Sequence, residues 1–101
     1  MILYNVTINV EDDIHDEWLA WMLNEHIPAV IATGLFQSYR MFKLLTRFEE
    51  ETGTTYSVQY HLDNIDKYEE YRQTFAPALQ KETIDKWGER FLAFRTLMEE
   101  V

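Results

Sequence analysis

Residues 18–36 of this 101-residue chain read WLAWMLNEHIPAVIATGLF, and the stretch determines how the rest of the sequence can fold. Its apolar residues have the spacing of a helix packed on a core, at about 100° per residue. The residues expected on the buried side are Ile14, Trp18, Trp21, Met22, Ala29 and Ala32, with Leu19 and Val30 at its edge. Gly34 suits the left-handed position that follows a helix. We therefore expect one long amphipathic helix that ends at Gly34.

Pro28 lies inside this expected helix. Proline has no N–H to donate, and its ring crowds the carbonyl group four residues earlier, which here belongs to Asn24. The sequence therefore predicts a kink around residues 24–26, where freed carbonyl groups need other partners.

Residues 2–10 alternate strictly between apolar and polar side chains, which is the pattern of a half-buried strand. One face carries Ile2, Tyr4, Val6, Ile8 and Val10, and the other carries Asn5, Thr7 and Asn9. An acidic segment then ends the alternation, and Asp13 is a good N-cap for the helix that follows.

Two further strands are expected after the helix. Residues 35–48 form a long strand that is apolar on both faces and so requires cover on both. A charged turn at residues 49–53 leads into residues 55–62, where apolar and polar side chains alternate again. The two strands should form a hairpin.

A second helix follows, capped by Asp63 or Asn64. Pro77 predicts a kink or a break near Phe75. Residues 91–98 form a last strand. The apolar stripe expected along the second helix is Ile65, Tyr68, Phe75, Ala76, Leu79 and Thr83.

The order of elements is β-α-β-β-α-β in one domain, residues 1–101. Right-handed crossovers and hairpin pairing favour an α+β, ferredoxin-like sandwich, which is a four-stranded antiparallel sheet with two helices on one face. The other face of the sheet is left open. The side chains expected on that open face are Asn5, Thr7, Asn9, Ser57, Gln59 and His61.

Composition and charge exclude several classes of protein. With 18 acidic and 9 basic residues, the net charge of −9 opposes binding to nucleic acid and to anionic membranes. The chain has no cysteine, which excludes disulfides, thiolate nucleophiles and cysteine-bound zinc, and indicates a reducing cytoplasm. We expect no signal peptide, because the sequence opens on the alternating strand pattern, and no membrane span, because no apolar run is long enough.

Five short pieces, at residues 4–7, 25–28, 33–36, 75–79 and 94–96, read YNVT, EHIP, TGLF, FAPAL and FRT. Through them the sequence resembles, over nearly its whole length, an uncharacterised family of short bacterial proteins, a domain of unknown function predicted to be ferredoxin-like. This resemblance implies the fold and no activity.

Residues 21–40 also resemble the first helix and turn of the dimeric α+β-barrel superfamily. In its EthD-like branch an aromatic–Trp pair is followed by His, one spacer and Pro, and then by a Pro-Gly turn. Trp21 matches the first aromatic residue, His26 and Pro28 match the His and Pro, and residues 33–34 match the turn. Met22 stands where the branch has its Trp.

The second resemblance implies a homodimer whose sheets pack together, with a pocket for small organic molecules between helices and sheet. Some members of the superfamily are monooxygenases, lyases or polyketide cyclases that need no cofactor, and others degrade haem with a His on the second helix. Residues 63–88 contain no His, so we expect neither haem nor another cofactor.

His26 is the leading candidate for chemistry. It lies at the margin of the apolar helix side, beside Glu25 and near the predicted kink, where a neutral imidazole can act as a general acid or base. The alternative is a structural His bonded to a freed carbonyl group. A cavity of about 300 Å³ or more beside His26 would favour catalysis, and a ring fully bonded to backbone would exclude it.

Tyr60 is the expected hydrogen-bond partner in such a reaction, because it points from the sheet toward the helices. The candidate ligand contacts are Trp18, Trp21, Glu25, Tyr4 and Tyr56. The alternative for the aromatic residues is that they only pack the core or a dimer interface. Arg40 and Arg95 can clamp carboxylates, although with so many acidic residues available we expect them to form structural ion pairs.

Two functional hypotheses follow. The first is a homodimer of unknown function that buries its open sheet face between protomers and binds a small organic ligand between helices and sheet. The second is a cofactor-independent enzyme of the dimeric-barrel kind, with His26 as the proton-transfer residue. No metal site is expected, because His15 and His26 lack the i, i+4 spacing of a zinc-binding pair.

Overall fold

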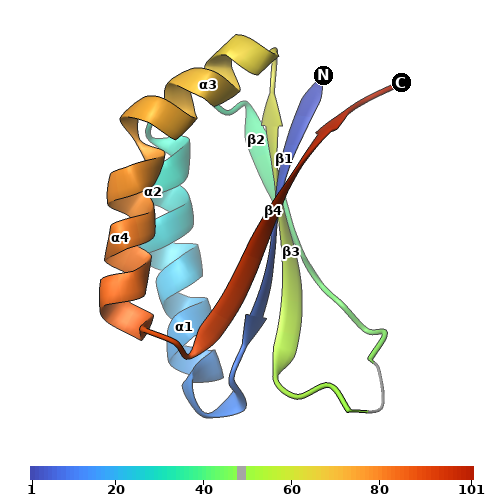
Figure 1. Ribbon diagram of the computed structural model, residues 1–101, viewed down its shortest axis with the longest axis vertical. Helices are drawn as coiled ribbons and strands as arrows, with labels where there is room; N and C mark the ends of the chain where they lie inside the picture. The colour runs from blue at the N-terminus through green and yellow to red at the C-terminus, as the bar shows by residue number, and fades with distance from the viewer. Residues whose placement is uncertain (48–49) are drawn as a thin grey trace.

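The sheet has the strand order β2-β3-β1-β4, and every neighbouring pair is antiparallel. The computed structural model describes residues 1–47 and 50–101. The strands are β1 (Ile2–Val10), β2 (Ser38–Lys43), β3 (Thr54–Leu62) and β4 (Phe91–Glu99). All labelled helices lie on one side of the sheet (Figure 1). The ferredoxin-like α+β fold expected from the sequence is confirmed.

The register of the sheet places two kinds of side chain on its two faces. Val6 pairs with Val58 and Arg95, and this row faces the helices. The next row, in which Thr7 pairs with Ser57 and Phe94, therefore lies on the opposite face. Val10, Val58 and Leu62 are fully buried, so the core lies between the sheet and the helices.

The first helical region has four parts. A 3₁₀ turn (Asp12–Ile14) leads into α1 (His15–Trp21), a π-helical turn (Met22–His26) and α2 (Ile27–Ile31). The expectation that Asp13 caps this helix is wrong. No side chain caps the start of α1, and the Asp13 carboxylate instead pairs with Arg90, the residue just before β4.

The π-helical turn lies where Pro28 predicted a kink. The Ile27 N–H donates to the Met22 carbonyl, five residues back, which accommodates one residue more than an α-turn would. This extra residue rotates everything after it. Ile27 and Val30 are buried while Ala29 and Ala32 are exposed, so the buried stripe expected from an uninterrupted helix is wrong beyond Met22.

The second helical region breaks as Pro77 predicted, into α3 (Ile65–Thr74) and α4 (Ala76–Trp87). The break also changes which residues are buried, because α3 and α4 run in different directions (Figure 1). Ile65 is exposed, contrary to expectation, and Tyr71 is buried in its place.

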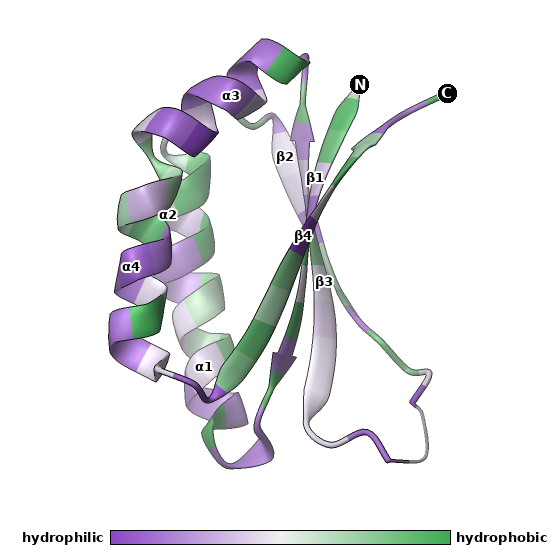
Figure 2. Cartoon of the chain, in the orientation of Figure 1, coloured by the Kyte–Doolittle hydropathy of each residue, from purple (hydrophilic) through white to green (hydrophobic). Residues whose placement is uncertain are grey.

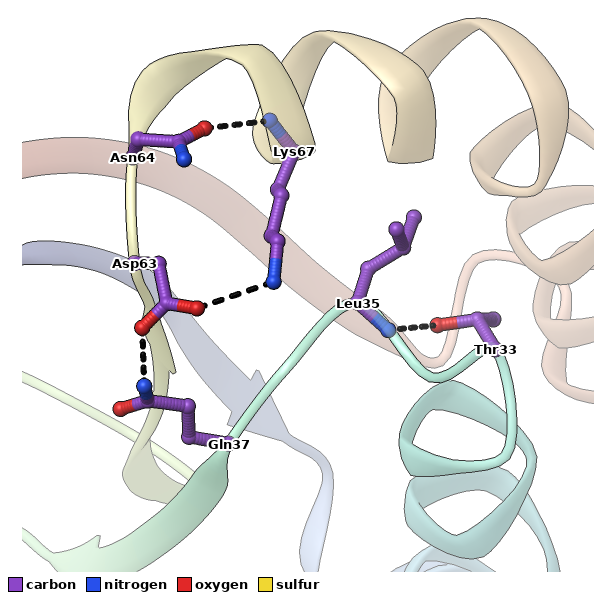
Figure 3. A network of polar contacts seen from close by, with 6 residues as sticks. All are labelled: Thr33, Leu35, Gln37, Asp63, Asn64 and Lys67. Carbon is purple, nitrogen blue, oxygen red and sulfur yellow. Dashed lines mark hydrogen bonds and ion pairs between the residues drawn. The ribbon is translucent and has the colours of Figure 1, made fainter.

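Asn64 is the N-cap of α3, since its side-chain oxygen accepts a hydrogen bond from the Lys67 N–H at 3.2 Å. Asp63 accepts hydrogen bonds from the Gln37 amide and, at 2.9 Å, from the Lys67 ammonium group (Figure 3). In this way the start of α3 is joined to the segment that precedes β2. A hydrogen bond from the Leu35 N–H to the Thr33 hydroxyl, at 3.5 Å, lies in the turn after α2.

The second strand is shorter than the expected span of residues 35–48. Its partner β3 begins at Thr54, and the Leu44 N–H makes the last bond to it, reaching the Thr55 carbonyl at 2.9 Å. Leu45 is 87% exposed. The expected strand end at Phe48 and the first turn residue, Glu49, lie outside the described residues. Before β2, Phe36 is buried in the core and is not part of the strand.

The open face of the sheet is polar along its centre and apolar along its edges. Asn5 accepts a hydrogen bond from the Ser57 hydroxyl at 2.5 Å and donates one to Thr7 at 3.0 Å. On the edge strands, Phe42 and Phe94 are 47% and 64% exposed. Figure 2 shows hydrophobic residues along the half of β4 that follows α4.

Candidate functional site

A cavity lies between the helices and the sheet. The polar side chains that line it include Tyr4, Tyr60, Tyr71, His26, Gln80 and Arg95, and the apolar lining comes from Trp18, Met22, Val30, Val58 and neighbouring residues. It offers about 40 Å³ to the centres of water-sized molecules. By itself this enclosed space holds a few waters and is smaller than the ~300 Å³ set above as the size that would favour catalysis at His26.

The cavity adjoins a second and larger space, the α4–β4 groove. This groove runs from Gln80 and Gly88 on the helical side to Leu92 and Arg95 on the strand, with a volume of about 620 Å³. Five side chains line both spaces, namely Gln80, Thr83, Phe91, Ala93 and Arg95. The two spaces therefore share a wall, and the groove opens at the protein surface; we refer to them together as the recess.

His26 is the last residue of the π-helical turn, and its ring lines the cavity. The ring stacks on Trp21, with centroids 5.0 Å apart and planes 25° from parallel. Burial, and secondarily the Arg95 charge, lower the pKa of His26 from 6.5 to about 4. The imidazole is thus neutral at pH 7. It makes no hydrogen bond with a residue in the described part of the chain, so it is not held by a backbone carbonyl.

The tyrosines form a cluster of rings at one end of the cavity. Tyr4 stacks on Tyr60 at 6.0 Å, and Phe36 meets Tyr71 edge-on at 4.8 Å. Burial raises the pKa of Tyr4, Tyr60 and Tyr71, so their phenols are uncharged at pH 7. Arg95 acts on the Tyr4 phenol and partly offsets the effect of burial.

The hydroxyl groups of Tyr60 and Tyr71 have no hydrogen-bond partner among residues 1–47 and 50–101. Both side chains are almost completely buried, at 2% and 4% exposure. Within the described residues, the only unpartnered side-chain N or O atom that is fully enclosed by protein is Nε1 of Trp87. The two phenol oxygens therefore open onto the cavity, where a ligand or water can reach them.

Four of the residues expected from the sequence line this cavity together: Tyr4, Trp18, His26 and Tyr60. Trp21 lies behind the His26 ring and packs edge-on against Trp87 at 5.9 Å. Glu25 is exposed and is not part of the lining.

Tyr56 lies elsewhere, at the end of β3 nearest α1. Its hydroxyl is 2.6 Å from Nε2 of His15, whose Nδ1 is 2.9 Å from the Asp16 carboxylate. Burial, and secondarily the Asp16 charge, raise the pKa of Tyr56. These bonds satisfy the phenol, and Tyr56 does not line the cavity.

Sequence reasoning missed Tyr71, Gln80 and the free charge of Arg95. Tyr71 follows Tyr68 by three residues and precedes Phe75 by four, so helical spacing would have placed it with them. The expected structural ion pair of Arg95 is absent among the described residues, because no acidic side chain there lies within ion-pair distance.

No group of three or more His, Asp or Glu side chains is placed to hold a metal ion in the part of the chain that the structure describes. In the same residues, no helix has the length and apolar character needed to span a membrane.

Comparison with known protein families identifies the family of this chain. The model of a domain of unknown function, DUF4286, matches residues 1–101. The chain belongs to the DUF4286 family. No curated protein gives a significant match to this DUF4286 chain.

Solved structures resemble the DUF4286 chain in fold. An EthD-family protein of Bacillus halodurans matches with 14% identity, a TM-score of 0.69 and full coverage of both chains. A candidate antibiotic biosynthesis monooxygenase of Deinococcus radiodurans matches with 10% identity and a TM-score of 0.69, over 100% of this chain and 93% of that one.

The hydroxynitrile lyase of Passiflora edulis matches the DUF4286 chain with 13% identity and a TM-score of 0.51, over 99% and 95% of the two chains. At these identities the likeness extends to the fold alone. This similarity in fold agrees with the resemblance of residues 21–40 to the EthD-like branch.

Proposed function

We propose that this DUF4286 protein binds a small organic molecule in the recess formed by the cavity and the α4–β4 groove. The observation that carries the proposal is the set of unsatisfied polar groups in the cavity. The Tyr60 and Tyr71 hydroxyls and the His26 ring border one apolar space without a protein hydrogen-bond partner among the described residues. Buried polar groups in folded proteins are otherwise paired, and a ligand supplies the missing partners.

A thermal-shift screen of small aromatic and polyketide-like compounds tests this proposal. A ligand at 100 times its Kd adds about 2.7 kcal/mol to the free energy of unfolding. For a domain of this size, that raises Tm by roughly 10 °C or more.

A blocked variant, Ala93→Phe, places a ring where cavity and groove meet and should lose the response. The matched control is Ala78→Phe, which adds the same ring at an exposed position on α4 outside the recess. Equal responses of both variants to every active compound would place binding elsewhere and refute the proposal.

We also propose that the protein is a homodimer formed through its open sheet face. That face carries Phe42, Leu92 and Phe94 on its edge strands, and these side chains are 47%, 74% and 64% exposed in the single chain. They lie on the two opposite edge strands, and a second copy packed on this face would cover both edges. Light scattering at micromolar concentration should give twice the mass of the chain, and a stable monomer would refute the dimer.

A second candidate function is a cofactor-independent enzyme in which His26 abstracts a proton and Tyr60 donates a hydrogen bond to the developing oxyanion. The observation that favours it is that a neutral, unbonded imidazole and an unbonded phenol line the same cavity. Whether this protein is a binding protein or an enzyme therefore depends on whether His26 transfers a proton.

The test is deuterium exchange at the acidic CH₂ group of 2-tetralone, followed by NMR in D₂O. Wild type should accelerate exchange, and His26→Gln should be slower by about 100-fold, the usual contribution of a general base. Equal rates in the two proteins would remove the catalytic role. A cytoplasmic location, which the absence of cysteine supports, is tested by cell fractionation.

A further inference from the structure

Arg95 stands where the cavity and the α4–β4 groove meet. It lies on the helix-covered face of β4, paired in register with Val6, and it lines both spaces. It forms no ion pair within residues 1–47 and 50–101, although the chain carries 18 acidic residues. Because a guanidinium group stays protonated at any physiological pH, Arg95 places a positive charge without an ion-pair partner among the described residues at this junction.

The remaining polar groups of the cavity are neutral and do not balance this charge. Burial keeps the Tyr60 phenol protonated and the His26 imidazole unprotonated at pH 7. No carboxylate belongs to the cavity lining in the described residues, and Glu89 lies in the outer groove beside Gly88. Arg95 lowers the pKa of both His26 and Tyr4, so its field extends into the cavity.

The walls of the α4–β4 groove suit a flat, apolar body. Ile84, Phe91, Leu92 and Ala93 line the groove, and the rings of Tyr4, Tyr60 and Tyr71 border the inner cavity beyond it. An aromatic ring packs well against such apolar side chains. The unpaired hydroxyls of Tyr60 and Tyr71 can donate hydrogen bonds to a ligand oxygen that reaches the cavity, whereas the Tyr4 hydroxyl interacts with Arg95.

We infer that the ligand is an aromatic carboxylate, with its ring against the apolar side chains of the α4–β4 groove and its carboxylate paired with Arg95 where the groove meets the cavity. This rests on the proposed function and adds the chemical class of the ligand. A guanidinium–carboxylate pair forms two parallel N–H···O bonds, which fixes orientation as well as charge. The net charge of −9 repels anions in general, so a preference for the anion has to come from the site itself.

Calorimetric titration with 2-naphthoate and 2-naphthamide tests the inference, because the two probes have nearly the same shape and differ in charge. Wild type should bind the carboxylate at least about tenfold more tightly, the usual advantage of a charge-assisted hydrogen bond. Arg95→Gln should abolish this preference, and Arg95→Lys should keep part of it. The control is Arg72→Gln on α3, which removes an exposed arginine that pairs with Glu69, and it should keep the full preference.

A second measurement on wild type does not depend on how the variants fold. Saturating 2-naphthoate should raise the NMR-measured pKa of His26, because a nearby carboxylate favours the imidazolium form, whereas 2-naphthamide should not. Equal affinities of the two probes for wild type, or an unchanged preference in Arg95→Gln, would overturn the inference and leave small-molecule binding intact. Failure of both probes and of the compound screen would refute the proposed function instead.

Discussion

Acidification should destabilise this protein through His26, and His26→Gln should remove that part of the pH dependence. In the folded state burial and the Arg95 charge lower the pKa of His26 from 6.5 to about 4. In the unfolded chain the imidazole regains its ordinary pKa, so between these two values the unfolded state binds a proton that the folded state does not. The free energy of unfolding therefore falls as the pH falls through this window, and His26 adds no slope above or below it.

The size of the effect follows from the two pKa values. Because one pH unit is worth about 1.4 kcal/mol per proton, the window from 6.5 to about 4 corresponds to about 3 kcal/mol. About 2 kcal/mol of this should be lost between pH 7 and pH 5. Water that enters the cavity solvates the imidazolium form, so these values are upper bounds.

Urea unfolding followed by tryptophan fluorescence, at several pH values and one fixed protein concentration, measures the effect. Wild type should lose about 1 M in its urea midpoint between pH 7 and pH 5 relative to His26→Gln, given the m-value of a small domain. An NMR titration of the His26 ring reads the same pKa directly. Parallel stability curves for the two proteins, together with a ring that titrates near its ordinary pKa, would refute the reasoning.

Three further predictions concern stability and assembly. Tyr60→Phe removes a buried hydroxyl without a described partner, so urea unfolding should show a change within about 1 kcal/mol while the affinity for ligand falls. Phe94→Asp should convert the proposed dimer to a folded monomer by light scattering with unchanged circular dichroism, because Phe94 is 64% exposed in the single chain. Gly53→Ala should cost more than about 2 kcal/mol in urea unfolding, because φ is +76° and the new Cβ would lie 2.6 Å from the Val10 carbonyl oxygen. Gly34→Ala, with φ of +80° and no atom within 4 Å of the new Cβ, should cost only about 1 kcal/mol.

The fold was predictable because its signals are local. Strict alternation places Val6 and Val58 on the buried face of the sheet, and Pro77 marks where the second helical region breaks. These patterns depend on the period of one element at a time. The family resemblance also held, since the DUF4286 model matches residues 1–101.

The incorrect predictions concern residues whose positions depend on more than the repeating pattern of one regular element. Asp13 has the right residue type for a cap, but its carboxylate pairs with Arg90, which lies 77 residues away in sequence. Uninterrupted helical spacing through Pro28 predicts Ala29 and Ala32 in the core, but the extra residue of the π-helical turn rotates both to the surface. No single-element pattern contains that information.

The candidate site was predictable only in part, for the same reason. His26 and Tyr60 were expected to meet because each faces the core from its own element, and both line the cavity. Arg95 was assigned to a structural ion pair because acidic residues are abundant in the sequence. The number of acidic residues in a sequence does not show where their carboxylates lie in the fold. The carboxylates that the structure describes are mostly on the solvent side of the helices and at the turns.

The π-helical turn has a consequence for related sequences that differ in length. Leu23, Asn24 and Glu25 are all exposed, so losing one of them would allow Met22 and Ile27 to join as neighbouring turns of an ordinary α-helix with the same hydrophobic contacts. Folding therefore does not require this exact number of residues between Trp21 and Pro28. A homologue shortened by one residue here would retain its architecture and would still present His26 to the cavity, because His26 directly precedes Ile27.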